Sequence, residues 1–291
     1  MDPWLIVFGF GVGALVGTTG MGGGSLMTPL LILVFGIKPV VAVGTDLAYA
    51  AITKTAGGFL HFRKGTVQTN LAWWLALGSC PGAVLGVVLL ERLGLDDILL
   101  PMIAAALLLT GSLVLFRALM KQGADERNEV ILETRHKVAA VVLGSTVGFV
   151  LGLTSAGSGT LIAIGLILGF RLMPRRVVGT DVFHAAILLW VAAIAHLFSG
   201  NVDLLLTLTI LIGSLPGVWL GTHLATRLPE RGLRPALGVV LLGAGLALLS
   251  KAGADIPAAV IVAVPLALGA LAFLVLRKSQ VKTPLIVRTD P

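Results

Sequence analysis

Residues 4–35 read WLIVFGFGVGALVGTTGMGGGSLMTPLLILVF, which is two apolar stretches separated by a glycine-rich loop. The apolar stretches, residues 4–17 and 26–35, are shorter than the ~20 residues that a helix needs to cross a bilayer. Residues 138–153 and 161–170 repeat the arrangement around a loop that reads TSAGSGT at 154–160. Such a pattern predicts helices that enter the membrane and are interrupted inside it, which is permitted only where the loop is enclosed by protein.

The composition indicates a membrane protein along the whole chain. Of 291 residues, 57% are hydrophobic and only 12% are charged, and apolar blocks at 98–116, 177–198, 204–225 and 256–276 are long enough to span a bilayer. The net charge of +7 does not indicate a nucleic-acid partner, because the basic residues lie between apolar blocks. A single cysteine, Cys80, excludes disulfides within the chain and metal sites built from several cysteines. We expect no cofactor, no metal and no removable signal peptide.

An internal duplication relates the two halves of the chain. Adding 135 to a position in the first half gives its counterpart in the second without a gap, so that Gly44-Thr45-Asp46 corresponds to Gly179-Thr180-Asp181. The same offset relates Pro39 to Pro174, His61 to His196, Gly78-Ser79 to Gly213-Ser214, and Pro81-Gly82 to Pro216-Gly217. One register that holds through glycine, proline, aspartate and histidine indicates a repeat.

The predicted fold class is an all-α integral membrane protein with two inverted-topology repeats. Each repeat contains a re-entrant or broken helix followed by three transmembrane helices, and one extra transmembrane helix follows the second repeat. We expect the first membrane repeat at residues 1–120, a cytoplasmic linker at 121–136 and the inverted repeat at 137–250. The extra helix is expected at 251–277 and a cytoplasmic tail at 278–291. Inverted repeats with broken helices are typical of secondary transporters.

The distribution of basic residues predicts the orientation. If each opening element returns to the side from which it entered, the basic residues other than Lys54 fall on one side of the membrane, except Lys38, Arg92 and Lys251. The positive-inside rule then places the C-terminus in the cytoplasm and the N-terminus outside.

Several motifs resemble a known family. They are Gly13, Gly17, Gly22-Gly23-Gly24 and Pro29, then Gly36-Ile37-Lys38-Pro39, the two Gly-Thr-Asp segments, the His61, Gly65 and Val67 segment, and Gly-Ser-x-Pro-Gly at 78–82 and 213–217. Together they resemble the TauE/SafE family of sulfite exporters and related anion permeases, from Gly9 to about Leu249. The resemblance implies transport of sulfite, thiosulfate or an organosulfonate such as sulfoacetate, and a bacterial inner membrane. The second repeat departs from the family pattern, with Ser155, Ala156 and Ser158 where the first has Gly20, Met21 and Gly23.

The two loops are the predicted substrate site. An anion inside the membrane needs hydrogen-bond donors, and an exposed helix N-terminus supplies free N–H groups and a positive partial charge. Glycine lets the backbone approach a ligand, and hydroxyls donate to sulfur-bound oxygens. The candidate substrate-binding residues are Thr19, Gly22, Gly23, Gly24, Ser25, Ser155, Gly157, Ser158, Gly159 and Thr160. The alternative is that these glycines only permit close helix packing.

A second predicted group lies in the helices that follow the loops. Its members are coupling or cavity-lining candidates: Thr45, Asp46, Tyr49, Thr180, Asp181 and His184. Intramembrane acids carry protons or bind a coupling cation in transporters, whereas an acid near a helix start can instead cap the helix. Both interpretations stay open at this point.

Lys54 lies eight residues after Asp46 inside an apolar block, and Leu189 occupies the equivalent position. An intramembrane lysine is costly, so it is expected to attract the anion, to pair with Asp46, or to extend toward a polar edge. His61 and His196 end equivalent helices, where solvated termini are the ordinary interpretation.

Two alternatives to a secondary transporter remain. A passive anion channel also uses broken helices. An intramembrane hydrolase would pair Ser155 or Ser158 with His184 or His196. The chain lacks a G-x4-G-K-[ST] segment, so ATP would have to act through a partner subunit. The expected partners are a small sulfur-containing anion and the lipid bilayer, with a proton as candidate coupling ion, no nucleic acid, and a homo-oligomer left open.

Overall fold

A computed structural model describes residues 3–19, 24–119, 127, 130–225 and 230–281 of the chain. Its helices are α1 (Pro3–Thr19), α2 (Gly24–Val34), α3 (Pro39–Arg63), α4 (Thr69–Arg92), α5 (Asp96–Leu119), α6 (Thr134–Thr154), α7 (Ser158–Leu168), α8 (Pro174–Phe198), α9 (Leu204–Ala225), α10 (Glu230–Lys251) and α11 (Ala258–Val281). Within the described residues, the remaining regular contact is an isolated bridge between Arg127 and Leu172. The all-α prediction is confirmed, and the helix bounds differ from the predicted ones by a few residues at each end.

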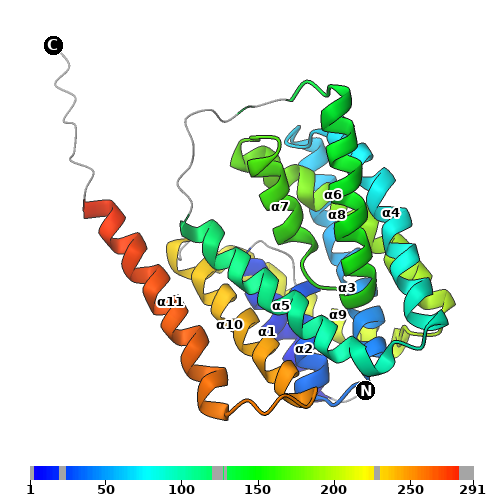
Figure 1. Cartoon of the computed structure of the whole chain (residues 1–291), viewed down its shortest axis with the longest axis vertical. Helices are drawn as coiled ribbons and strands as arrows, with labels where there is room; N and C mark the ends of the chain where they lie inside the picture. The colour runs from blue at the N-terminus through cyan, green and yellow to red at the C-terminus, as the bar shows by residue number, and fades with distance from the viewer. Residues whose placement is uncertain (1–2, 20–23, 120–126, 128–129, 226–229, 282–291) are drawn as a thin grey trace.

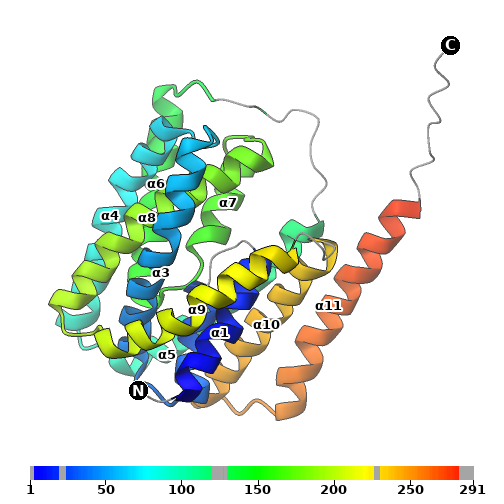
Figure 2. The same cartoon turned by 180° about the vertical axis from the view of Figure 1, so that it is seen from behind.

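Helices of the two halves pack against each other in matched pairs. α3 packs against α8 and α5 against α10, while α1 packs against α9 and α4 against α6. Under the offset of 135, α1 corresponds to α6 and α4 to α9, so the α1–α9 pair corresponds to the α6–α4 pair. The α3–α8 and α5–α10 pairs each join two equivalent helices. In Figures 1 and 2, α3, α4, α6, α7 and α8 gather on one side, and α1, α2, α5, α9, α10 and α11 on the other. The opposite insertion of the halves in a membrane stays a prediction.

The closest helix contacts are made at glycines spaced four residues apart. A Cβ added to Gly13 of α1 would lie 2.3 Å from the carbonyl oxygen of Ser214, and one added to Gly148 of α6 would lie 2.1 Å from that of Ser79. Gly13 and Gly148 are equivalent in the two halves, as are Ser79 and Ser214. In lipid there is no hydrophobic driving force between helices, so van der Waals contacts at a close backbone approach stabilise their packing. These helix glycines therefore permit close packing; they are not the loop glycines proposed to bind the substrate.

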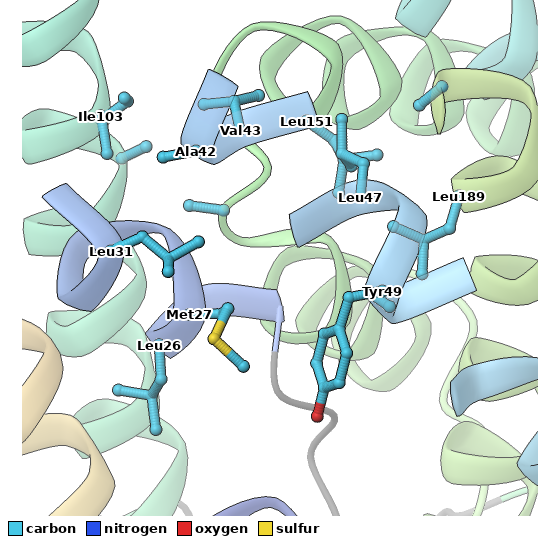
Figure 3. Packing of buried hydrophobic residues seen from close by; sticks show 14 of the residues in the cluster. Leu26, Met27, Leu31, Ala42, Val43, Leu47, Tyr49, Ile103, Leu151 and Leu189 are labelled. Carbon is cyan, nitrogen blue, oxygen red and sulfur yellow. The ribbon is translucent and has the colours of Figure 1, made fainter. Parts of the chain in front are cut away.

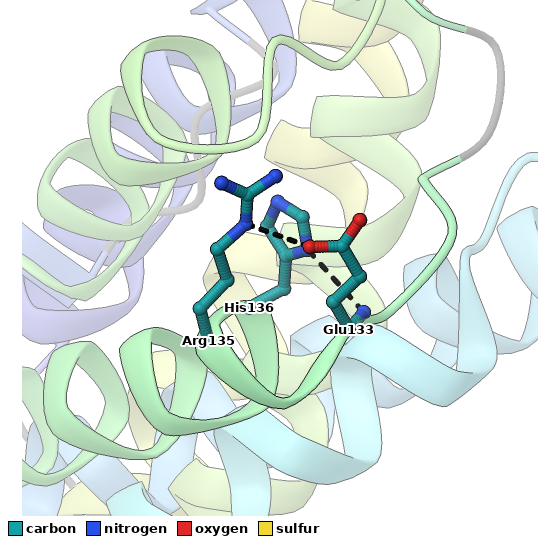
Figure 4. A network of polar contacts seen from close by, with 3 residues as sticks. All are labelled: Glu133, Arg135 and His136. Atoms are coloured by element: carbon teal, nitrogen blue, oxygen red, sulfur yellow. Dashed lines mark hydrogen bonds and ion pairs between the residues drawn. The ribbon is translucent and has the colours of Figure 1, made fainter.

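α6 begins with a capping box formed by Glu133 and His136, two residues of the predicted linker. Glu133 accepts a hydrogen bond from the backbone of His136, while the Glu133 backbone N–H bonds to His136 Nδ1 at 3.3 Å. Arg135 Nε lies 2.8 Å from Glu133 Oε2 in an exposed ion pair (Figure 4). Because these reciprocal bonds satisfy helix N-terminal donors, α6 starts at Thr134, three residues inside the predicted linker.

The apolar core lies where α2, α3, α5 and α6 meet. Met27 and Leu31 of α2 lie in one buried cluster with Leu47 of α3, Ile103 of α5 and Leu151 of α6 (Figure 3). All five side chains have an exposed fraction of 0%. This packing holds α2 beside the first turns of α3, where Asp46 lies.

The outer surface is apolar, as a lipid environment requires. Six described helices are long and apolar enough to cross a membrane by length and composition: α4, α5, α6, α8, α9 and α11. The apolar segment Ala258–Val275 of α11 is only 11% buried. This helix packs against α10 and α5 at the edge of the molecule (Figures 1 and 2). The chain is thus a multi-pass α-helical membrane protein.

Two span predictions need adjustment. α6 has 21 residues and is long enough to cross, although the sequence predicted residues 138–153 as half of a broken element. α3 has 25 residues but is not among the six, because polar residues such as Asp46 and Lys54 lower its mean hydropathy. α3 buries these polar groups against other helices instead of presenting them to lipid.

Candidate functional site

The second loop is the part of the predicted substrate site that the structure describes. Ser155 ends α6 in the left-handed conformation with φ 56°, and Gly157 precedes α7 with φ 91°. The first backbone bond of α7 runs from Leu161 N to Gly157 O at 3.0 Å, so the N–H groups of residues 158–160 have no acceptor within their own helix. Ser158 and Thr160 are buried, with exposed fractions of 7% and 8%.

The first loop is described only at its ends. Thr19 is the last residue of α1, and Gly24 and Ser25 begin α2. Gly22 and Gly23 lie outside the described residues, as do the side-chain contacts of Thr19 and Ser25.

Asp46 lies at a junction of three helices. Its Oδ2 accepts from Thr28 Oγ1 of α2 at 2.7 Å and from Ser155 Oγ at 2.9 Å. The two hydroxyl oxygens are themselves 2.5 Å apart. All three residues are buried, and Asp46 has an exposed fraction of 0%. The break between α6 and α7 is therefore held against an acid from the other half of the chain.

The equivalent acid, Asp181 on α8, has different surroundings. Ala163 occupies the position equivalent to Thr28, and Gly20 the position equivalent to Ser155. Neither residue carries a hydroxyl, so the three-oxygen contact cannot form in the same way at Asp181. Asp181 has an exposed fraction of 8%, and its Oδ1 has no hydrogen-bond partner among the described residues.

Lys54 is the sequence neighbour of a residue that contacts its own equivalent in the other half of the chain. Its neighbour Thr55 accepts a hydrogen bond from Trp190 Nε1 at 2.9 Å, and positions 55 and 190 are equivalent under the 135-residue offset. A contact between equivalent residues lies on the two-fold relation between α3 and α8. Lys54 is 8% exposed and interacts electrostatically with both Asp46 and Asp181.

The predicted ion pair between Lys54 and Asp46 does not form. Within the described part of the chain, no carboxylate oxygen lies within 4.0 Å of the Lys54 ammonium. The reason is their spacing, because eight residues along one helix separate the two Cα atoms by about 12 Å at 1.5 Å per residue. The lysine charge thus acts on both acids without a direct ion pair to either among the described residues.

Thr45 and Thr180 tie the halves together. Thr180 Oγ1 accepts the backbone N–H of Gln68 at 3.0 Å, and Thr45 Oγ1 accepts that of Asp203 at 3.2 Å. Both donors precede a helix that belongs to the other half, α4 or α9. The two threonines therefore satisfy helix-terminal donors across the interface between the halves.

His184 and Tyr49 occupy equivalent positions beside equivalent serines. His184 Nε2 lies 2.8 Å from Ser79 Oγ, and both side chains are fully buried. The Tyr49 hydroxyl lies near the Ser214 hydroxyl, but the two are not placed to form a hydrogen bond. Each aromatic ring thus points from the α3–α8 pair toward the serine of a Gly-Ser-x-Pro-Gly segment.

Two of the ordinary structural interpretations are wrong. Asp46 and Asp181 do not cap their helices, since α3 begins at Pro39 and α8 at Pro174, seven residues earlier in each case. His196 is not solvated, because it has an exposed fraction of 0% and its Nε2 lies 2.8 Å from Gly152 O.

The described contacts do not include the serine–histidine pairing of the hydrolase alternative. Ser155 Oγ contacts Asp46 and Thr28, whereas His184 and His196 bond to Ser79 and Gly152. The hydrogen bonds of both histidines thus go to other groups than the proposed nucleophiles, which gives no support to an activated serine here.

Sequence reasoning missed Thr28, Ser79 and Ser214 as members of the polar interior. Ser79 and Ser214 recur in both halves within Gly-Ser-x-Pro-Gly, so their repetition was a usable signal. Thr28 has Ala163 as its counterpart and stands alone in an apolar helix, so only the packing of α2 on α3 reveals its role.

The chain is similar to known membrane transporters over most of its length. The family model described as Sulfite exporter TauE/SafE matches residues 5–248. The probable membrane transporter protein YjnA of Bacillus subtilis (strain 168) is 38% identical over 255 residues, covering 86% of this chain and 100% of that protein. YdhB, a probable membrane transporter protein of the same organism, is 30% identical over 245 residues, covering 84% of this chain and 99% of that protein.

A more distant relative extends the same pattern. A probable membrane transporter protein of Xylella fastidiosa (strain 9a5c) is 26% identical over 252 residues, covering 85% of this chain and 94% of that protein. No solved structure matches the chain. With its apolar helices, its broken α6–α7 element and this coverage by the family model, the chain belongs to the TauE/SafE sulfite exporter family of membrane transporters.

Proposed function

We propose that this protein is a secondary transporter for a small sulfur-containing anion: sulfite, thiosulfate or an organosulfonate such as sulfoacetate. The anion is held midway across the membrane between the two glycine-rich loops and moves by alternating access. A proton is the proposed coupling ion. The family description as a sulfite exporter supports the class of substrate.

The observation that carries the proposal is Lys54. This lysine is buried, makes no ion pair with a described residue, and is the sequence neighbour of Thr55, which contacts the equivalent residue Trp190 of the other half. Lys54 interacts electrostatically with both acids but has no carboxylate oxygen of a described residue within 4.0 Å. A buried cation that lacks a direct counter-ion is costly, and a bound anion removes that cost. Lys54 is therefore the proposed charge partner of the anion.

The first turn of α7 provides the proposed hydrogen-bond donors. Residues 158–160 have N–H groups without an acceptor in their helix, and the Ser158 and Thr160 hydroxyls make no hydrogen bond to a described residue. Sulfite and sulfonate groups carry three oxygens that accept such bonds. The positive end of the α7 dipole adds to the attraction.

A carrier is favoured over a passive channel by the burial of the polar residues. Asp46, Tyr49 and His184 each have an exposed fraction of 0%. A conducting pore would present such groups to a continuous aqueous path. Buried polar groups at the interface of the two halves instead suit a site that opens to one side at a time.

Counterflow in proteoliposomes tests the proposed function. Purified protein is reconstituted with unlabelled sulfite, thiosulfate or sulfoacetate inside, and uptake of the labelled anion is followed, with sulfate and chloride as controls. Saturable exchange of one sulfur anion is the expected result. Linear, non-saturating flux would support the channel, and no flux of any tested sulfur anion through folded protein would overturn the proposal.

A further inference from the structure

We infer that Asp46, Thr28 and Ser155 form a proton-binding site, and that Asp181 does not form a second one. The inference rests on the proposed function only for the use that the bound proton serves. Its evidence is the arrangement of oxygen atoms around Asp46, which is independent of the identity of the anion.

The first argument is a count of hydrogen atoms. Three oxygens lie in mutual contact, with Thr28 to Asp46 at 2.7 Å, Ser155 to Asp46 at 2.9 Å and Thr28 to Ser155 at 2.5 Å. Each contact at these lengths needs one hydrogen between its oxygens. The two hydroxyls supply at most two hydrogens, and any other bond made by Ser155 lowers that supply. The third hydrogen has to be a proton on Asp46 Oδ2.

A neutral Asp46 closes the ring of bonds. Asp46 Oδ2–H donates to one hydroxyl, that hydroxyl donates to the other, and the last donates back to Oδ2. With an ionised Asp46, two of the oxygens would face each other at 2.5 Å with no hydrogen between them whenever both hydroxyls donate to the carboxylate. The proton is taken from water and returned to water, so no other reactant is needed.

The second argument is the free oxygen of the same carboxyl. Asp46 Oδ1 is buried and has no hydrogen-bond partner among the described residues. A buried carboxylate oxygen that bears charge and lacks a donor is far more costly than the carbonyl oxygen of a neutral acid. Both observations therefore require the same protonation state.

The neighbouring helices bring no counter-charge into contact with Asp46. The side-chain groups of described residues in contact with the Asp46 carboxyl are the hydroxyls of Thr28 from α2 and of Ser155 at the end of α6, and both are neutral. Lys54 and Tyr49 come from α3 itself, and within the described residues Lys54 makes no ion pair with Asp46. Moving the Lys54 charge toward Asp46 would favour release of the proton, which links the site to the charge that the anion uses.

Asp181 supplies an internal comparison. Ala163 and Gly20 occupy the sequence positions equivalent to Thr28 and Ser155, and the described residues form no three-oxygen contact at the Asp181 carboxyl. The duplication has thus kept both acids while building the hydroxyl ring around one of them. A proton site is assigned to Asp46 for this reason.

Infrared spectroscopy tests the assignment without any substrate. Neutral carboxylic acids have a C=O stretch that is separate from the bands of carboxylates and amides, and at about pH 8 exposed carboxyls are ionised. The unmodified protein, labelled with ¹³C-carboxyl aspartate, is expected to show this band. Asp46→Asn removes it and Asp181→Asn keeps it. Thr28→Val keeps the shape of the side chain and shifts the frequency, because a hydrogen bond to the carboxyl is lost.

Transport measurements then connect the site to coupling. Proteoliposomes with a pH indicator inside report protons moved per sulfur anion, and Asp46→Asn is expected to abolish the proton signal per anion transported. A band that survives Asp46→Asn, a band lost in Asp181→Asn, or uptake driven by a sodium gradient in place of a pH gradient would each overturn the inference. If the unmodified protein moves no sulfur anion, the proposed function fails while the infrared result still decides the proton site.

Discussion

At the scale of single residues, the polar interior described by the structure combines a lysine that has no ion-pair partner among the described residues with two acids in unequal surroundings. Lys54 lies beside the Thr55–Trp190 contact that joins equivalent positions of α3 and α8. Asp46 accepts hydrogen bonds from two hydroxyls, whereas no hydroxyl of a described residue bonds to Asp181. A duplicated fold has thus been made chemically asymmetric by a few substitutions, and these residues are where function is most sensitive to change.

Replacing Lys54 tests the proposed charge partner of the anion. Lys54→Gln is expected to weaken anion binding by about 10- to 100-fold, since a hydrogen bond to a charged group contributes roughly 1.5–3 kcal/mol. Lys54→Arg keeps the charge and should retain more affinity than Lys54→Gln. Calorimetric titration or counterflow KM measures the change. Thr53→Ala is the matched control, because Thr53 bonds only to carbonyls of its own helix among the described residues. Equal affinities in Lys54→Gln and Thr53→Ala would contradict the assignment.

Thr180 carries a prediction about stability. Thr180→Ala removes the acceptor of the half-buried Gln68 N–H, which is expected to cost about 0.5–1.5 kcal/mol, the net contribution of a typical hydrogen bond. The melting temperature in detergent should fall relative to the unmodified protein. Thr146→Ala serves as the control, since the exposed Thr146 hydroxyl donates to Val142 O within its own helix. A melting temperature unchanged in Thr180→Ala would show that the cross-half bond contributes nothing measurable.

At the scale of helices, glycine rows set the distances between elements of opposite halves. α1 contacts α9 through Gly9, Gly13 and Gly17, and α6 contacts α4 through the equivalent Gly144, Gly148 and Gly152. These contacts hold the long arm of each interrupted element against a helix of the other half. The break at Ser155 is thereby fixed at the depth of Asp46.

Two glycines of α1 provide a matched test of this packing. Gly13→Ala is expected to destabilise the protein strongly, because its Cβ would lie 2.3 Å from Ser214 O and 2.7 Å from Ser214 Cα, and backbone cannot move aside cheaply. Gly11→Ala lies in the same helix with no atom within 4 Å of the added Cβ. It should be neutral or stabilising by up to about 1 kcal/mol, the difference in helix propensity. Thermal melts in detergent compare the two, and similar melting temperatures would contradict the close-packing interpretation.

At the scale of the whole molecule, an apolar exterior surrounds a polar centre, and the charged residues lie mainly at the ends of the helices. Exposed apolar side chains cover α4, α9 and α11, among them Trp73, Trp219 and Phe273. Lys64 and Ala252 lie in exposed connections, after α3 and after α10. These connections are predicted to lie on opposite sides of the membrane.

Cysteine labelling tests the predicted orientation in intact cells. With Cys80 replaced by serine, a cysteine at Ala252 is expected to react with a membrane-impermeant maleimide, because the α10–α11 connection is predicted outside. A cysteine at Lys64 should react only after the cells are permeabilised, since the α3–α4 connection is predicted in the cytoplasm. The reverse pattern would invert the orientation, and labelling of both sites in intact cells would contradict opposite placement.

Sequence reasoning reached the helix bounds to within a few residues and the break between α6 and α7, because both depend on local properties. Apolar length marks each helix, and the glycine-rich loop marks the break between α6 and α7. It failed where distance through space matters. The pairing of Lys54 with Asp46 and the capping role of Asp46 both looked reasonable along one helix, yet neighbouring helices supply the actual contacts.

The sequence by itself determined the membrane class, the 135-residue duplication and the family resemblance, because apolar length and a repeated register of glycine, proline and aspartate are written in the order of residues. Only the tertiary structure decided that Thr28 and Ser155 meet at Asp46, that Thr45 and Thr180 bind the opposite half, and that Lys54 lies beside the two-fold contact. The physical reason is that hydrogen bonds form between atoms about 3 Å apart, and residues separated by more than a hundred positions come that close only when helices of the two halves pack together.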